Sequence, residues 1–279
     1  MQNSINLTPH LYNYGIDELA YYDQGKGEQT ILLIHGFGED HAIWKNQIEF
    51  LSTHYRVIAP NLPGVHCKPL ALHHSQAPNI RMYVEVLHEL MHHLHIEQYY
   101  IVGHSMGGYI GLSFADYYVN HVQGLLLFHS TTYEDNEAKK TSRMKVAEFI
   151  QEWGVSKYLE TATPNLFGDA FKKTNPGVIQ NVIESGSSIS QEAMIQFVFA
   201  MRNRKAMTHL LKQSNLPVWM IAGEADLAVT IQDSLEQIKL LPSSNSLVLK
   251  EVGHMGMLEA TDLVNQFIKK MLVGNNDAL

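Results

Sequence analysis

Hydrophobic positions along this chain fall into short continuous runs separated by stretches with helical spacing. The runs are rich in β-branched and aromatic residues, which is typical of strands buried on both faces of a sheet. Between the runs, apolar residues recur every three to four positions and predict amphipathic helices. This alternation predicts an α/β fold, with a mostly parallel central sheet and helices on both faces. The predicted strands are an edge strand at 19–22, then 30–34, 55–60, 99–103, 124–128, 216–223 and 246–249.

The alternation stops between the runs at 124–128 and 216–223. This segment has helical periodicity, a polar and charged beginning, and breaks at Pro164, Gly168 and Pro176-Gly177. We interpret residues 131–213 as a helical cap inserted into a core formed by residues 1–130 and 214–279. Ligands of open α/β folds bind at the carboxyl edge of the sheet, so we expect the cap to lie over that edge.

Composition narrows the functional classes. The 279 residues are 45% hydrophobic and 17% charged, as expected of a globular enzyme with a sizeable core. The net charge of −8, from 20 basic and 28 acidic residues, argues against nucleic acid or an anionic membrane as a partner. The single cysteine, Cys67, excludes an internal disulfide. No secretory leader or transmembrane run is visible, so we expect a cytoplasmic protein; the pattern does not predict an oligomeric state.

The sequence around Ser105 predicts a sharp turn between the strand at 99–103 and a helix that follows it. Ser105 lies in a Gly-x-Ser-x-Gly pattern, with Gly103 before it and Gly107 after it. A serine held in a strained backbone conformation leaves no room for side chains two residues away on either side, which explains both glycines. The turn would expose the Ser105 hydroxyl beside the positive end of a helix.

Two further residues with catalytic chemistry follow predicted strands. Asp226 comes after the strand at 216–223, and His254 after the strand at 246–249. A serine hydroxyl is a weak nucleophile that needs a base, and an imidazole oriented by a carboxylate suits that role. Glu224 and Asp233 are alternative carboxylates near Asp226, and Asp135 is a further alternative beyond the preceding strand, at 124–128. His35 and His104, beside backbone turns, are expected to shape the site by hydrogen bonds.

Four motifs together resemble the α/β-hydrolase superfamily, and within it the single-domain branch with a helical cap. They are His35–Gly38, Gly103–Gly108, Gly223–Asp226 and Gly253-His254. The resemblance implies a catalytic triad of Ser105, Asp226 and His254, in the chain order of that family. It also implies an oxyanion hole formed by the backbone N–H groups of Phe37 and Met106, whose side chains would shape the pocket. This mechanism needs no cofactor and no metal.

One loop departs from the family pattern. Family members often carry an aspartate and Gly-x-Gly in the loop after the second strand, where this chain has Asn61 to Lys68 with Gly64 alone. The departure leaves the predicted triad intact and distinguishes this loop from the family pattern.

The leading hypothesis is a serine hydrolase that acts on a small-molecule carboxylic ester. A carbon–carbon bond hydrolase of the kind that cleaves vinylogous diketone acids would use the same triad with a cationic clamp, and Arg202 and Arg204 are candidates unless they lie on a solvated helix flank. A proline-releasing peptidase would need acidic cap residues near the substrate amine. A binding protein that has lost turnover is the alternative outside catalysis.

Histidine spacing on the helix predicted at 81–95 also allows a zinc pair of His88 and His92. No cysteine or carboxylate completes such a set, so a solvated helix face is the preferred interpretation.

Overall fold

The computed structural model describes residues 7–15, 17–72, 77–213 and 215–273. The first six residues, on which the absence of a leader was judged, lie outside this part of the chain, as does Ser214 at the predicted cap boundary. None of the described helices is long and apolar enough to cross a membrane.

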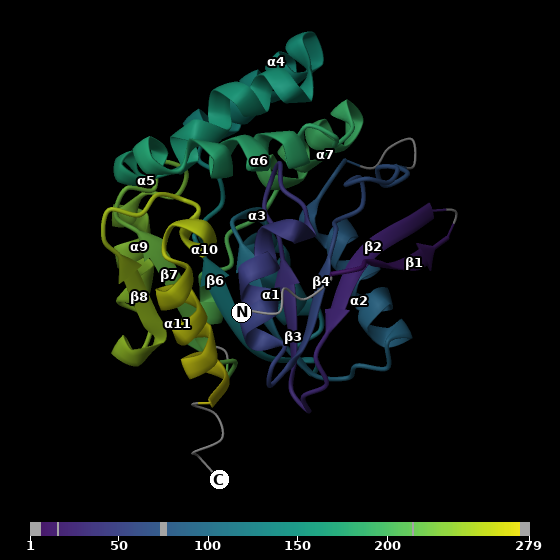
Figure 1. The fold of residues 1–279 in the computed structure, drawn as a ribbon, viewed down its shortest axis with the longest axis vertical. Helices are drawn as coiled ribbons and strands as arrows, with labels where there is room; N and C mark the ends of the chain where they lie inside the picture. Colours follow the sequence, from purple (N-terminus) through teal and green to yellow (C-terminus); the bar gives the residue numbers. More distant parts are fainter. Residues whose placement is uncertain (1–6, 16, 73–76, 214, 274–279) are drawn as a thin grey trace.

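In the described part of the chain, eight strands form one sheet in the order β1-β2-β4-β3-β5-β6-β7-β8 (Figure 1). From β4 to β8 all neighbours are parallel, whereas β1 and β2 are antiparallel to their neighbours. This confirms the predicted fold class. The strands are β1 (His10–Tyr14), β2 (Asp17–Gln24), β3 (Thr30–Ile34), β4 (Arg56–Pro60), β5 (Tyr99–His104), β6 (Val122–Phe128), β7 (Val218–Gly223) and β8 (Ser246–Leu249).

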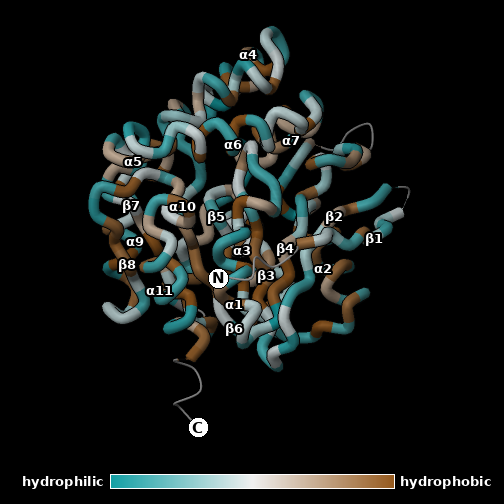
Figure 2. Tube along the Cα trace, viewed as in Figure 1, coloured by the Kyte–Doolittle hydropathy of each residue, from teal (hydrophilic) through white to brown (hydrophobic). Residues whose placement is uncertain are grey.

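The central strands are buried, as their hydrophobic composition predicts. Every residue of β3, β5 and β7 is buried, because helices cover both faces of the sheet. Figure 2 shows these strands as the hydrophobic centre of the molecule, with polar positions on the outer surfaces of the helices. The predicted edge strand at 19–22 is instead an inner strand, β2, because β1 pairs outside it. The half-exposed, polar β1 gave no hydrophobic run to reveal it.

Helices of the core pack in two groups. The short helix η1 (His41–Trp44) leads into α1, which contacts α10 and α11, while α2 contacts α3. The helices α10 and α11 are separated at Ala260, which has non-helical backbone angles. The helices are α1 (Lys45–Leu51), α2 (Ile80–His93), α3 (Met106–Tyr117), α9 (Ile231–Ile238), η3 (Ser243–Asn245), α10 (Gly256–Glu259) and α11 (Thr261–Val273).

Between β6 and β7 the described chain is helical, and Figure 1 shows α4, α6 and α7 above one edge of the sheet. Gly154 (φ 82°, ψ 169°) interrupts α4, so its second part turns away from the first. The helical spacing from Met194 to Leu211 spans two helices, α7 and α8. The elements are α4 (Glu137–Ala162), η2 (Thr163–Leu166), α5 (Asp169–Thr174), α6 (Pro176–Gly186), α7 (Gln191–Arg202) and α8 (His209–Gln213). The division into a cap at 131–213 and a core remains a prediction.

The loop after β4 lacks the aspartate and the second glycine of the family pattern, and other contacts define its conformation. The side chain of Asn61 accepts a hydrogen bond from the His41 N–H at 2.9 Å, a bond that an aspartate would also accept. His66 occupies the place of the second glycine and takes a left-handed conformation with φ 57°. Its ring contacts the Asp40 carboxylate at 3.1 Å, which holds this conformation in place.

Candidate active site

Ser105 lies at the turn where β5 ends and α3 begins. Its backbone angles (φ 50°, ψ −111°) are in a strained region for a residue with a side chain. A Cβ atom on Gly103 would lie 2.3 Å from the Gly107 carbonyl oxygen, and one on Gly107 would lie 2.2 Å from the Ile34 carbonyl oxygen. Both positions therefore accept only glycine, as the sequence argument requires. The packing of this turn against β3 aims Ser105 toward a cavity at the edge of the sheet.

Asp226 and His254 meet at the same edge, from the loops after β7 and β8. His254 Nδ1 lies 2.7 Å from Asp226 Oδ2, and both side chains are buried. The other carboxylate oxygen accepts the backbone N–H groups of Ala228 and Val229 at 2.8 and 2.9 Å. Because a carboxylate only accepts hydrogen bonds, Nδ1 of His254 carries a proton and Nε2 is left as the basic atom.

His129 is a second histidine on Asp226 and was not predicted. It follows β6 directly, and its Nδ1 lies 3.1 Å from Asp226 Oδ2. Complete burial lowers the pKa of His129 to about 4 against the opposing attraction of Asp226, so the ring is neutral at pH 7. Burial opposes the ionisation of Asp226, but His254 and His129 together hold its pKa well below the usual range. The sequence feature that could have identified His129 is its position directly after a buried strand.

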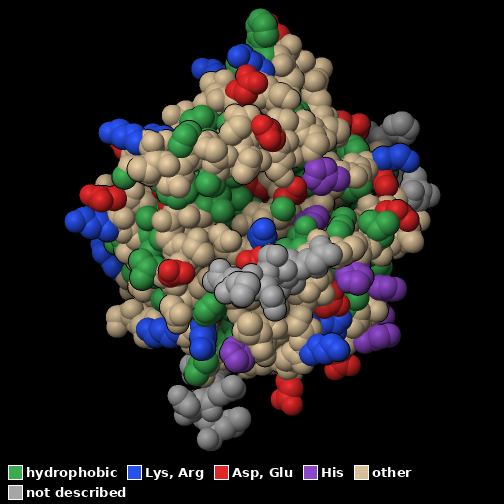
Figure 3. Space-filling view, in the orientation of Figure 1, with side chains coloured by type: hydrophobic (Ala, Val, Ile, Leu, Met, Phe, Trp, Pro, Cys, Tyr) green, Lys and Arg blue, Asp and Glu red, His purple; other side chains and the backbone are tan. Residues whose placement is uncertain are grey.

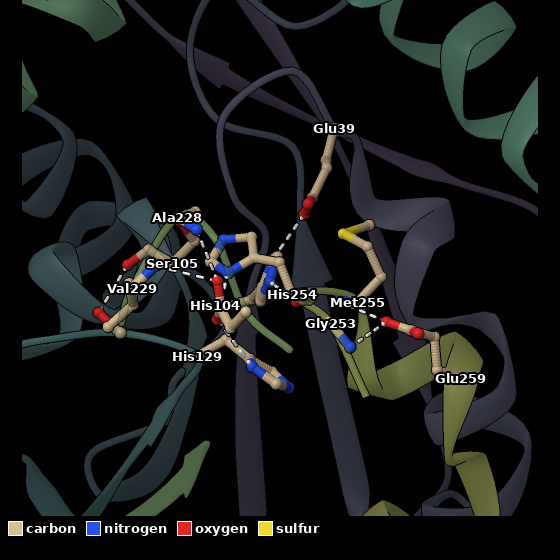
Figure 4. A network of polar contacts seen from close by, with 12 residues as sticks. Glu39, His104, Ser105, His129, Ala228, Val229, Gly253, His254, Met255 and Glu259 are labelled. Atoms are coloured by element: carbon tan, nitrogen blue, oxygen red, sulfur yellow. Dashed lines mark hydrogen bonds and ion pairs between the residues drawn. The ribbon is translucent and has the colours of Figure 1, made fainter. Parts of the chain in front are cut away.

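Glu39 and His104 form a second carboxylate–imidazole pair beside His254 (Figure 4). Glu39 Oε2 lies 3.0 Å from His104 Nδ1 and accepts the Gly36 N–H at 2.7 Å. On the other side of the ring, His104 Nε2 lies 2.9 Å from the His254 carbonyl oxygen. This chain of contacts connects the turn at Gly36, the residue before Ser105 and the backbone of His254. The prediction that His104 shapes the site by hydrogen bonds agrees with this geometry.

The two neighbours of the His104 ring are both acceptors, so the pair needs a proton on each ring nitrogen when Glu39 is ionised. Burial disfavours the charge on His104, but the charge of Glu39 and its hydrogen bond outweigh burial and raise the pKa of His104. Burial likewise opposes the ionisation of Glu39, and His104 lowers its pKa nonetheless. The pair is therefore a buried ion pair within the site.

Replacing Glu39 with glutamine should destabilise the protein in a pH-dependent way. The raised pKa of His104 contributes stability that is lost as pH rises through that pKa, and the lowered pKa of Glu39 contributes stability that is lost as pH falls through it. The loss in Glu39→Gln should thus be largest near about pH 5.5, at about 3 kcal/mol, and smaller near about pH 9. Thermal melts of both proteins across this range measure it; a loss independent of pH would contradict a charged pair.

Phe37 and Met106, the predicted oxyanion donors, lie on either side of Ser105. Met106 is the first residue of α3, and neither its backbone N–H nor that of Phe37 donates to another residue in the described part of the chain. Both N–H groups are thus free to bind an oxyanion. The Phe37 side chain lines the cavity and packs against the Tyr158 ring of α4, with ring centroids 5.8 Å apart. The Met106 side chain is fully buried and does not line the cavity, contrary to the expectation that it shapes the pocket.

The cavity above Ser105 has a volume of about 270 Å³ and lies between the core and the helical segment. Ser105 and His254 both line it, together with apolar side chains of the helical segment such as Leu159, Leu166 and Val182. The backbone N–H of His254 donates to the Leu166 carbonyl at 2.6 Å, which ties the histidine loop to that segment. Glu259 reinforces the connection, because it accepts N–H groups of Gly168, Gly253 and Met255.

The alternative acids do not reach His254. Asp135 is fully buried and forms ion pairs with Arg204 (Nη2 to Oδ1, 2.7 Å) and Arg143 (Nε to Oδ2, 3.1 Å). Burial opposes the ionisation of Asp135, but the two arginines lower its pKa. Glu224 accepts the Glu251 N–H at 3.3 Å, and Asp233 lies in the first turn of α9.

The predicted cationic clamp is also placed elsewhere. Arg204 is held by Asp135 and stacks on the Tyr109 ring at 4.0 Å, and Arg202 binds the Asn203 side chain at 3.3 Å. Neither lines the cavity beside Ser105, so these candidate residues do not form a clamp there. The cations that line it are Lys139 and Arg143, both on α4.

Metal-ligating geometry occurs in one group of the described residues: His129, Asp226 and His254. The same Asp226 oxygen lies at hydrogen-bond distance from both Nδ1 atoms, so protons account for these contacts. The alternative of a zinc pair at His88 and His92 gains no further metal-ligating residue among the described residues, and His88 stacks on Tyr118 with ring centroids 3.8 Å apart.

Comparison with known proteins agrees with this geometry. Residues 29–261 match the family model described as the alpha/beta hydrolase fold. The chain belongs to the α/β-hydrolase family. A thermophilic esterase from Thermogutta terrifontis, solved with malate bound, has 27% identity to it and a TM-score of 0.86, covering 96% of this chain and 98% of the esterase.

Curated relatives of this α/β-hydrolase are hydrolases of several kinds. The (E)-2-((N-methylformamido)methylene)succinate hydrolase of Acinetobacter baylyi is 25% identical over 279 residues, 98% of this chain and 97% of the relative. The 2-hydroxy-6-oxo-6-(2'-aminophenyl)hexa-2,4-dienoic acid hydrolase of Metapseudomonas resinovorans is 26% identical over 256 residues, 88% of this chain and 84% of the relative. The two relatives described here are hydrolases that act on different substrates.

Proposed function

We propose that this α/β-hydrolase cleaves carboxylic esters of small molecules through a catalytic triad of Ser105, His254 and Asp226. The observation that carries the proposal is the hydrogen bond of 2.7 Å between Asp226 and His254, beside the cavity that Ser105 also lines. Asp226 fixes the ring so that Nε2, the unprotonated nitrogen, is available to Ser105. The structural similarity to an esterase supports the same reaction class.

The reaction divides into two steps. The Ser105 hydroxyl oxygen attacks the ester carbonyl while His254 Nε2 takes its proton, and the N–H groups of Phe37 and Met106 hold the oxyanion. The tetrahedral intermediate collapses, the C–O bond to the alcohol breaks, and His254 returns the proton to the leaving oxygen. Water then attacks the acyl-enzyme by the same route and releases the acid. Asp226 stabilises the imidazolium in both steps and stays ionised.

The second candidate is carbon–carbon bond hydrolysis of a vinylogous diketone acid. The name of the Metapseudomonas relative supports it, and the same triad would serve. A proline-releasing peptidase lacks support, because Glu39, the acidic residue among the described cavity-lining residues, is occupied by His104. A ligand-binding protein without turnover predicts stabilisation by a ligand with no product.

The test is kcat/KM for nitrophenyl esters of increasing acyl length, on the wild type and on Ser105→Ala. We expect a maximum at one acyl length, because a cavity of about 270 Å³ limits the acyl group, and loss of activity in Ser105→Ala. Activity that survives in Ser105→Ala would overturn the triad. No turnover of any ester by the wild type would move the proposal to carbon–carbon hydrolysis or ligand binding.

A further inference from the structure

We infer that Arg143 and Lys139 form an anion-binding subsite in the cavity, and that the substrate carries a carboxylate besides its scissile ester. This inference rests on the proposed function, because it names a class of substrate for the same cavity. It concerns the two cations of α4 that line the cavity with Ser105.

The two side chains are neighbours on one helix face. Lys139 and Arg143 are four residues apart in the first turns of α4, which places them one above the other. Lys139 Nζ donates to the Ala228 carbonyl at 3.0 Å, in the loop that holds Asp226. The start of α4 is thus fixed over the catalytic acid loop, and its cations lie close to the catalytic residues.

One ion pair fixes the Arg143 side chain and leaves its other N–H donors free within the described part of the chain. Its Nε donates to buried Asp135 at 3.1 Å, while its terminal nitrogens make no hydrogen bond within the described part of the chain. An arginine has five N–H donors, so the planar end that suits a carboxylate is left free. Lys139 likewise uses one of three donors on Ala228. A guanidinium fixed by a buried carboxylate is preorganised for an anion, because little side-chain freedom is lost on binding.

The local charge balance favours an anion. Asp135 carries one negative charge between Arg143 and Arg204, and Lys139 adds a third positive charge, which leaves two positive charges in excess in this group. The acid that lines the cavity, Glu39, is neutralised by His104. The local excess of positive charge contrasts with the net charge of −8 of the whole chain. On the face in Figure 3, basic side chains are scattered among acidic ones, so a general basic surface does not explain the pair.

Two hydroxyl groups complete the subsite. Ser142 and Tyr158 line the cavity beside Arg143, and neither hydroxyl makes a hydrogen bond to another described residue. Burial raises the pKa of Tyr158 while the charge of Arg143 lowers it, which agrees with their closeness. Hydroxyl donors next to a guanidinium and an ammonium are suited to the oxygens of a carboxylate.

A matched pair of esters tests the inference: mono-nitrophenyl adipate, with a free carboxylate, and its methyl ester, which is neutral and of similar size. We expect the wild type to prefer the anionic ester in kcat/KM, and Arg143→Gln to lower the ratio of anionic to neutral by about 10- to 100-fold. Lys139→Gln should lower it as well. Lys145→Gln is the control, because it removes the same charge from an exposed site on the same helix outside this cavity.

A binding measurement tests the subsite independently of the proposed ester hydrolysis. Calorimetry of adipate with Ser105→Ala needs no turnover, and a weaker Kd in Ser105→Ala/Arg143→Gln by about the same factor supports the subsite. Arg143→Gln leaves Asp135 paired with Arg204, so the double variant is expected to fold. An unchanged ester ratio or an unchanged Kd in the Arg143 variants would overturn the subsite. Failure of the wild type to hydrolyse either ester, with adipate binding retained, would overturn ester hydrolysis alone.

Discussion

Replacing His254 with alanine is expected to lower kcat for a nitrophenyl ester by about 10⁵-fold with little change in KM. In the proposed mechanism His254 Nε2 is the base for Ser105, and alanine would leave the hydroxyl without a proton acceptor. Stopped-flow or steady-state assays of nitrophenolate release measure the effect. The loss should be similar in Ser105→Ala, because both residues act in the same proton transfer.

The double variant Ser105→Ala/His254→Ala sharpens this prediction. Residues that act as a unit give non-additive losses, so the double variant should be no slower than the worse of the two single variants. Losses that multiply would show that the two residues act independently. Retention of more than about one hundredth of wild-type kcat in His254→Ala would contradict its role as the base.

The second large effect is expected at Asp226. Asp226→Asn should lower kcat by about 10⁴-fold, because the amide can donate to His254 Nδ1 and thereby favour the tautomer with a proton on Nε2. That tautomer cannot accept the proton of Ser105. The wild-type pKa of Asp226 lies well below its usual range, so ionisation of this carboxylate should not limit activity in mildly acidic buffer.

A variant of His129 tests how much its hydrogen bond to Asp226 contributes to catalysis. His129→Asn tolerates the left-handed backbone at this position (φ 47°) but is too short to donate as His129 does. We expect a loss of about 10-fold in kcat/KM, the effect of one hydrogen bond on a charged acceptor. A loss as large as that of Asp226→Asn would mean that His129, not Asp226 alone, determines the state of His254.

Much of the fold could be predicted because buried strands have a simple signature. The runs at 30–34 and 246–249 match β3 and β8 residue for residue. The strand ends then placed Ser105, Asp226 and His254 at one sheet edge, since the carboxyl ends of parallel strands meet there. Strand β1 was missed because its mixed polar and aromatic residues form an exposed edge.

The rest of the site depends on contacts between distant segments. Glu39 and His104 are 65 residues apart and His129 and Asp226 are 97 apart, so periodicity gives no sign of either pair. The cations of the helical segment between β6 and β7 show the same limit. Arg202 and Arg143 both follow helical spacing, and only the packing of α4 and α7 decides that Arg143 lines the cavity.

A covalent label tests the central claim most directly. Ethyl nitrophenyl hexylphosphonate loses nitrophenolate when an activated serine oxygen bonds to phosphorus, and the adduct imitates the tetrahedral intermediate. We predict that peptide mass spectrometry finds the label on Ser105 in the wild type, and that His254→Ala is labelled far more slowly. A label on another residue, or ester turnover by a wild-type protein that Ser105 labelling does not inhibit, would contradict the account.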